Sequence, residues 1–390
     1  MSVMGCTAQS EKHLQADRNG LAKLFIRRMI MIKKLFALIL SVSLLLALAV
    51  GCGTGSEPAD QPSDPPAEDT DNKGNDKTPD DPDTPDDPDS KTPSQPFTFQ
   101  AKLSSPYMVE IFGETMVQAW YNLVDAVLAG ESTFACPDEN TYDWIMGQFP
   151  DRYFPVFHAL IEKSYSDTAV ADGVASFRYK VPPEECAAML ADFETLVTNL
   201  LNETMKPEYT DMEKALALYC YFSSHYTYDN ETFEKQNREG YVDYVSSYRF
   251  LTTDTGICTE CARAYSYLLM QVGVDATTMM GSAHEWSYIR INGNNYRIDP
   301  TFAMGENNAL QYFMMSDADR EADFSPETFV ICSNYTQEYP HPEYVANDEF
   351  FDQIHSGYLE DFDHDTHIMH TYGYNRDHVR IDVDFDYTGF

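Results

Sequence analysis

The sequence predicts an α+β fold, a helix followed by antiparallel strands, from two adjacent patterns. Residues 256–272 carry apolar or small side chains at helical spacing, and Gly273 follows as a helix C-cap. Residues 284–300 form two alternating runs around Asn292–Gly293, a dipeptide typical of two-residue β-hairpin turns. A parallel sheet would instead require strands and helices to alternate along the chain.

Further elements are expected upstream of this core. Thr210 with Glu213 three residues later has the pattern of a capping box, which predicts that a helix begins there. Helical apolar spacing and strand-like alternation define the other elements. The expected elements are helices at 107–129, 184–203 and 210–225 and a strand at 175–182.

The N-terminal part of the sequence predicts export. Residues 31–52 contain two lysines, a long apolar run and a small residue before Cys52, the pattern of a secretory signal. Their end, Ala-Val-Gly-Cys, resembles the lipobox of bacterial lipoproteins, which implies that Cys52 is lipidated. A transmembrane anchor is the alternative, but the run is shorter than the roughly 20 residues that span a bilayer. Residues 1–30 do not fit a signal, so translation is expected to start at Met29 or Met31.

Residues 53–96 are expected to be a disordered tether. They contain 13 Asp and Glu residues, 10 prolines and no aromatic residue, so they cannot bury enough surface to offset the entropy of ordering. The whole chain has a formal net charge of −37, with 26 Lys and Arg against 63 Asp and Glu. Nucleic acid is therefore excluded as a partner, and a cationic substrate is favoured.

The predicted hairpin brings a histidine and an aspartate together. Counting outward from the turn sets Trp286 opposite Asp299 and His284 opposite Thr301. His284 and Asp299 then become diagonal neighbours on one face, with backbones roughly 7–8 Å apart. At that distance a carboxylate can orient an imidazole.

Cys258 is the candidate nucleophile because it lies in the first turn of its helix. Unpaired backbone N–H groups and the helix dipole stabilise a thiolate at such a position. Together with His284 and Asp299, it matches the order of nucleophile, base and orienting group in cysteine acyl transfer. Its own N–H would face the oxyanion. A second oxyanion donor is not assigned; Tyr226, Tyr228 and Tyr248 are candidates, with core packing as the alternative for each.

These residues resemble the core of the transglutaminase-like superfamily over about residues 205–305. The resemblance implies an α+β papain-like core in which N-terminal helices and a nucleophile at a helix start pack on an antiparallel sheet. It also implies that Cys258 is the nucleophile, His284 the base and Asp299 the orienting acid. Small departures from the usual motifs occur at Ile257, Glu285 and Ser287. The motifs that carry the resemblance are Gly256-Ile257-Cys258, His284-Glu285-Trp286 and Tyr296-Arg297-Ile298-Asp299-Pro300-Thr301.

Other interpretations of the cysteines and histidines remain open. Cys258 and Cys261 would suit a redox pair, but no βαβ unit frames them, and no second Cys-x-x-Cys supports a zinc site. Cys261 is therefore expected in the core, and no metal or cofactor is assigned. The six cysteines beyond Cys52 are expected to be mostly free and buried. His364, His367 and His370 suggest metal binding, with a solvated polar loop before a final strand as the favoured alternative.

The sequence therefore predicts a lipid-anchored enzyme on the extracellular face of a bacterial membrane. It would act on amide bonds of protein or peptide substrates through a thioester, with cell-wall peptides among the candidates and hydrolysis favoured over crosslinking. The alternative is a non-catalytic binding or adhesion module with a vestigial triad. The expected segments are an extension (1–30), a signal peptide (31–52), the linker (53–96), a helical N-terminal region (97–204), the catalytic core (205–305) and a C-terminal extension with closing strands (306–390).

Overall fold

The computed structural model describes residues 95–103, 105–164, 169–240, 242–281, 284–323, 330–331 and 344–390. The expected extension, signal peptide and Cys52 lie outside these residues, as does nearly all of the expected linker. Among the described residues, no helix is both long enough and apolar enough to cross a membrane.

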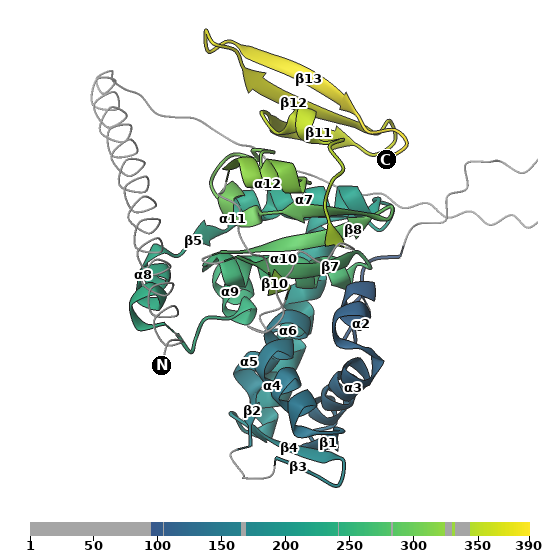
Figure 1. The fold of residues 1–390 in the computed structure, drawn as a ribbon, viewed down its shortest axis with the longest axis vertical. Coiled ribbons are helices and arrows are strands. Elements are labelled where there is room, and N and C mark those ends of the chain that lie inside the picture. The colour runs from purple at the N-terminus through teal and green to yellow at the C-terminus, as the bar shows by residue number, and fades with distance from the viewer. Residues whose placement is uncertain are drawn as a thin grey trace, which may run out of the picture. The chain divides into compact units, whose positions relative to one another are not determined.

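Helices and mainly antiparallel sheets make up the fold, with one short parallel pair of strands, so the α+β prediction is confirmed (Figure 1). The helices are α2 Pro106–Phe112, α3 Glu114–Leu128, α4 Glu139–Tyr153, α5 Phe157–Leu160, α6 Pro183–Thr204, α7 Asp211–His225, α8 Asn230–Glu239, α9 Ser247–Thr253, α10 Cys258–Gln271, α11 Pro300–Ala303, α12 Asp317–Asp323 and the 3₁₀ helix η2 Asp352–Ile354. The strands are β1 Thr133–Ala135, β2 Ile161–Lys163, β3 Val170–Ala171, β4 Val174–Tyr179, β5 Thr227–Tyr228, β6 Thr255–Gly256, β7 Asp275–Met280, β8 Glu285–Ile291, β9 Asn294–Ile298, β10 Val330–Ile331, β11 Tyr358–Asp363, β12 Ile368–Tyr374 and β13 Arg380–Asp386.

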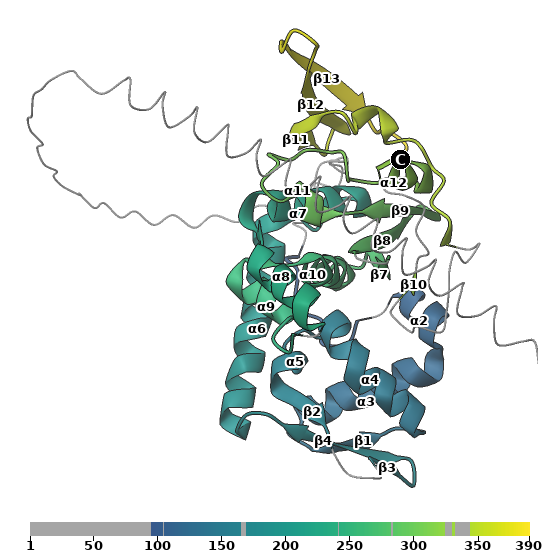
Figure 2. The same cartoon turned by 60° about the vertical axis from the view of Figure 1, so that its left-hand side comes forward.

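The central sheet has the strand order β10-β7-β8-β9, and helix α10 packs against β7 and β8 (Figure 2). Strand β8 is buried on both faces. On one face, Ser287 donates a 3.0 Å hydrogen bond to the backbone carbonyl of Ala262 in α10. On the other face, Trp286 and Tyr288 pack in an aromatic cluster with Tyr107. The sheet is thus held between a helix and a second apolar layer.

The hairpin register was predicted correctly up to the end of β9. Ile291 pairs with Asn294, and the turn residues Asn292 and Gly293 have φ angles of 53° and 81°. Positive φ at both central positions is the requirement of a type I′ turn, which Asn-Gly satisfies at little cost. The expected pairing of His284 with Thr301 is wrong, because β9 ends at Ile298 and Thr301 lies in α11.

The N-terminal region differs from the expected run of helices. The segment predicted as one helix is two, α2 and α3, separated by Gly113 at φ 78°. A short antiparallel sheet also occurs there, in which β4 pairs with β1, β2 and β3. Trp120 and Phe149 are fully buried where helices α3 and α4 meet. This region is therefore not only helical, and its aromatic side chains belong to the hydrophobic core that continues into α7 and α10.

The C-terminal sheet β11-β12-β13 is labelled in Figure 1, and side-chain hydrogen bonds join this part of the chain to the start of helix α7. The predicted capping box is present: Thr210 and Glu213 exchange hydrogen bonds of 2.7 and 3.2 Å. Glu213 is fully buried and also accepts a 2.7 Å hydrogen bond from the hydroxyl of Tyr387. His364 lies 2.9 Å from the same carboxylate. The cap of α7 thus doubles as an anchor for the C-terminal sheet.

The three histidines spaced by three residues do not converge. His364 and His367 both face Glu213, at 2.9 and 3.9 Å, whereas His370 pairs with the exposed Asp384 at 2.7 Å. His370 also lies within strand β12, so the expected polar loop ends before it. These contacts favour a structural role for the histidines.

Candidate functional site

Cys258 is the first residue of helix α10, and only the N-cap Ile257 separates it from the short strand β6. Gly256 in β6 must be a glycine, because a Cβ there would lie 2.6 Å from the ring of Phe250 and 2.8 Å from the carboxylate of Glu260. The thiol-bearing residue is buried, with 6% of its surface exposed. Its position at the helix start exposes the sulfur to the unpaired N–H groups of the first turn.

The start of α10 is fixed by Glu260, a fully buried carboxylate that sequence reasoning did not single out. Glu260 accepts hydrogen bonds from the backbone N–H groups of Ile257, at 3.0 Å, and Ser246, at 2.9 Å. Arg249 binds the same carboxylate through two nitrogens. A glutamate at the third helical position was visible in the sequence, and such a residue can reach back to the N-cap. The chain leading to Cys258 is therefore rigidly held.

His284 and Asp299 come together at the open end of the hairpin. His284 Nε2 lies 2.7 Å from Asp299 Oδ2, and Asp299 is completely buried. Cys258 lies near the same imidazole, because its charge contributes to the pKa of His284. Burial alone would lower the pKa of His284, but the charges of Asp299 and Cys258 and their hydrogen bonds raise it to about 10. The imidazole is thus held as an imidazolium at neutral pH.

Arg320 of helix α12 completes the buried surroundings of Asp299, and no sequence pattern marks this arginine as part of the site. Its guanidinium lies 3.6 Å from Asp299 Oδ2, with only 1% of the side chain exposed. The same group stacks on the ring of Trp286, 4.2 Å from its centroid. Trp286 in turn lies against His284, with centroids 6.0 Å apart and planes tilted by 21°. Imidazole, indole and guanidinium therefore form one packed group around the carboxylate.

The residue after His284 explains one departure from the usual motif. Glu285 is fully buried and binds Arg263 of α10 through two hydrogen bonds of 2.9 and 3.0 Å. Arg152 of α4 lies 3.5 Å from the same carboxylate, and Arg263 also pairs with Asp151. A buried carboxylate is tolerated when it is paired and hydrogen-bonded in this way. The network fixes the start of β8, and hence His284, relative to the nucleophile helix.

Among the three candidate tyrosines, only Tyr228 is close to the thiol. It lies on β5, which pairs in parallel with β6, so that Tyr228 is opposite Gly256. Burial raises its pKa, and negative charge on Cys258 and Asp299 raises it further. Tyr226 stacks on Phe250 and is buried, and its role is packing. Tyr228 is therefore a protonated donor beside the cysteine.

Cys261 lies in the core, as expected. It is fully buried within α10, and burial raises the pKa of its thiol well above the usual range. Cys258 and Cys261 are both free thiols, as are Cys136, Cys186 and Cys220, whereas Cys332 lies outside the described residues. The geometry favours one reactive thiol with a neighbour in the core.

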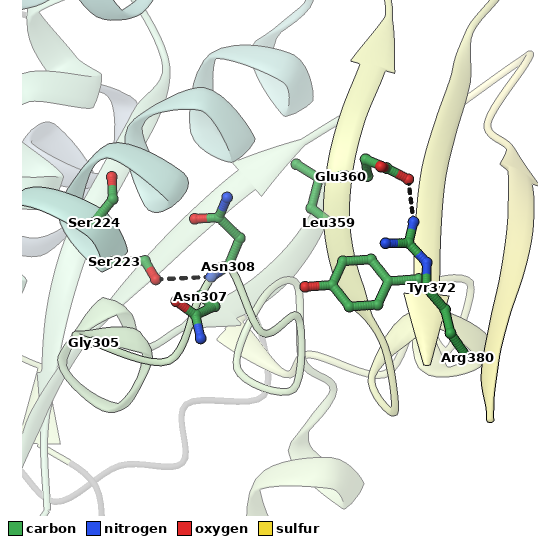
Figure 3. A pocket seen from close by; sticks show the side chains of 9 residues that line it. All are labelled: Ser223, Ser224, Gly305, Asn307, Asn308, Leu359, Glu360, Tyr372 and Arg380. Carbon is green, nitrogen blue, oxygen red and sulfur yellow. Dashed lines mark hydrogen bonds and ion pairs between the residues drawn. The ribbon is translucent and has the colours of Figure 1, made fainter. Parts of the chain in front are cut away.

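A polar pocket of about 530 Å³ lies elsewhere, between the end of α7 and the C-terminal sheet (Figure 3). Ser223 and Asn308 line one side and are joined by a 3.1 Å hydrogen bond. Tyr372 and Arg380 line the other side, with the guanidinium 4.2 Å from the ring centroid. None of the nine lining residues belongs to the Cys258, His284 and Asp299 group.

The site thus combines a thiol at a helix start with a histidine–carboxylate pair at the open end of an antiparallel hairpin. Residues 198–307 match the family model described as the transglutaminase-like superfamily. This range includes all three residues and agrees with the resemblance at about residues 205–305. A search of curated proteins found no match to the chain.

Proposed function

We propose that this protein is a cysteine acyl-transfer enzyme that cleaves amide bonds of protein or peptide substrates. The observation that carries the proposal is the contact chain from Cys258 through the His284 imidazole to Asp299 Oδ2, with 2.7 Å between the last two groups. Each group has the chemistry of its role: a thiol at a helix start, an imidazolium and a buried orienting carboxylate.

In the first half-reaction, the Cys258 thiolate attacks the amide carbonyl carbon. The oxyanion that forms accepts a hydrogen bond from the backbone N–H of Cys258 and a second from the Tyr228 hydroxyl. The His284 imidazolium gives its proton to the amide nitrogen, the C–N bond breaks, and amine or ammonia leaves. Asp299 keeps the ring oriented during this transfer, and a thioester on Cys258 remains.

In the second half-reaction, neutral His284 accepts a proton from water, and the hydroxide attacks the thioester. The C–S bond breaks, a carboxylic acid leaves, and the thiolate–imidazolium pair is restored. A lysine amine in place of water would give crosslinking. Hydrolysis is favoured because water is always present as an acceptor, whereas transfer needs a second bound substrate.

The proposed place of action is the extracellular face of a bacterial membrane, with Cys52 as the lipid-anchored residue. The signal-like residues 31–52 and the acidic, proline-rich residues 53–96 support it. A net charge of −37 favours cationic segments in the substrate, as in peptides of the cell wall or of surface proteins.

Alkylation of Cys258 by iodoacetamide, followed by peptide mapping and mass spectrometry, tests the site. We expect fast alkylation at neutral pH in the parent protein and slow alkylation in His284→Ala. His225→Ala is the matched control, because His225 is exposed at the end of α7. A Cys258 thiol no more reactive than free cysteine contradicts the proposal and favours a non-catalytic binding module.

Hydrolysis and transfer are separated by incubating the protein with a glutamine-containing peptide and a labelled amine. Release of a carboxylic acid or a cleaved peptide without label supports hydrolysis. Incorporation of the labelled amine supports crosslinking. The Cys258→Ala variant is the control for both reactions and should form neither product.

A further inference from the structure

Two carboxylates and an imidazole meet between helix α12 and the 3₁₀ helix η2, away from the proposed catalytic residues. Asp319 belongs to α12, Asp352 begins η2, and His355 follows η2 directly. One oxygen or nitrogen atom of each lies within 4.8 Å of the others. A 3₁₀ helix has three residues per turn, so residues three apart, such as Asp352 and His355, point the same way.

The contacts of His355 leave one particular nitrogen facing the carboxylates. Its Nε2 lies 2.8 Å from the backbone carbonyl oxygen of Phe313, and since a carbonyl oxygen only accepts, Nε2 carries the hydrogen. In the neutral ring, Nδ1 then has a lone pair. A hydrogen bond from the far ring nitrogen to a backbone carbonyl is the usual way in which proteins orient a metal-binding histidine.

The distance from His355 Nδ1 to Asp319 Oδ1 is 3.8 Å, which is too long for a hydrogen bond. Bonds of about 2.0–2.2 Å to one metal ion place neighbouring ligand atoms roughly 3–4 Å apart. The other oxygen of Asp319 is already used, because it accepts hydrogen bonds from the N–H and hydroxyl of Ser316, at 2.8 and 2.7 Å. Asp319 is therefore held with Oδ1 directed at the imidazole.

Electrostatics around the group also favour a cation. Asp319 and Asp352 bring carboxylate oxygens to within 4.8 Å of each other, and like charges at such a distance repel. Glu349 adds a further negative charge nearby. A divalent ion would relieve this repulsion.

We propose that Asp319, Asp352 and His355 bind a divalent transition-metal ion, for which Zn²⁺ is the probe. Imidazole suits Zn²⁺ and related ions, whereas Ca²⁺ and Mg²⁺ take oxygen ligands. The ion joins α12 to η2 and so fixes α12 in place. Arg320, which follows the ligand Asp319 in this helix, contacts Asp299. Binding does not depend on the proposed function; the effect on Asp299 matters for activity only if that function holds.

The test is isothermal titration of Zn²⁺ into the full chain carrying Cys258→Ala, so that the Cys258 thiol does not compete for the ion. In this background, Asp352→Asn and His355→Gln remove one ligand each. His370→Gln is the matched control, because His370 is an exposed histidine paired with an aspartate. Loss of even an outer-shell partner weakens metal sites by about 10–100-fold, so losing a ligand should cost roughly 100-fold or more.

One Zn²⁺ bound per chain, weakened by that factor in both ligand variants and unchanged in His370→Gln, is the expected result. Equal Zn²⁺ affinity in the parent and in Asp352→Asn would overturn the proposal, as would Ca²⁺ binding at least as tightly as Zn²⁺. Asp352 is exposed, so its asparagine variant should keep the fold even where His355→Gln does not. The effect of the ion on the helix that carries Arg320 is measured separately by amide hydrogen exchange. Zn²⁺ should slow exchange in residues 317–320 of the parent but not of Asp352→Asn. Equal exchange in the two proteins would show that the ion does not fix this helix.

Discussion

Replacing Asp299 by asparagine should uncouple the imidazole from the thiol while keeping the shape of the site. The pKa of His284 is about 10, against an ordinary 6.5. That difference of roughly 3.5 corresponds to about 5 kcal/mol of net preference for the imidazolium. Asp299 supplies the largest favourable contribution, its charge, and also a hydrogen bond. If Asp299 supplies over half of this preference for the imidazolium, Asp299→Asn removes about 3 kcal/mol of it, or roughly 100-fold in the protonation constant of His284.

The assay is the pH dependence of Cys258 alkylation, measured by mass spectrometry from pH 5 to 10 in parent and variant. In the variant the pKa of His284 should fall from about 10 to about 8. The rate should therefore change little at pH 7 and fall by roughly 10–50-fold between about pH 9 and 10, because fewer imidazolium ions remain there to stabilise the thiolate. Asp361→Asn removes an equal charge from an exposed position and should change nothing. An unaltered rate and pH profile in Asp299→Asn would refute the reasoning.

Three further results are expected. Because the folded-state pKa of His284 is raised, its charge stabilises the fold fully below about pH 6.5, and this stabilisation is lost as pH rises toward about 10. The midpoint of urea unfolding should therefore decrease over this pH range, and it should decrease less in His284→Gln. Activity should fall over the same pH range. Gly256→Ala should destabilise the protein by about 1–3 kcal/mol in urea unfolding, since the new Cβ would overlap a ring and a carboxylate. The control Gly147→Ala lies inside α4, where a Cβ meets nothing within 4 Å, and should stabilise the protein by about 0.5–1 kcal/mol. An unchanged free energy of unfolding in Gly256→Ala would contradict the close approach. Cys261→Ala should lower the free energy of unfolding by about 1 kcal/mol and leave activity unchanged. Cys258→Ala should abolish activity with little change in the melting temperature. Loss of activity in Cys261→Ala would instead support the redox interpretation.

Short-range chemistry made much of the core predictable. Asn292–Gly293 specifies a two-residue turn, and the turn fixes the pairing of β8 with β9 as far as Ser287 and Ile298. Thr210 and Glu213 specify the start of α7 for the same kind of reason, a bond between residues three apart. Where an element is specified by residues that are close in the sequence, both interacting residues can be identified from the sequence alone.

The rest depends on contacts that no local pattern contains. Arg320 reaches Asp299 because α12 folds back onto the end of the hairpin, and nothing in its neighbourhood in the sequence marks it as buried. Glu285 and Arg263 are 22 residues apart and are joined only once α10 packs on the sheet. The break at Gly113 was missed because the apolar spacing continues through it and a lone glycine is often tolerated in a helix.

The buried carboxylate of Glu213 has a consequence for the order in which the chain can fold. Its partner Tyr387 lies 174 positions further along the chain. Closing the core over α7 before the C-terminal sheet has docked would bury a charge that lacks the hydrogen bond from this tyrosine, so early collapse around the helix is penalised. Glu213 therefore links closure of the core over α7 to docking of the last strands of the chain.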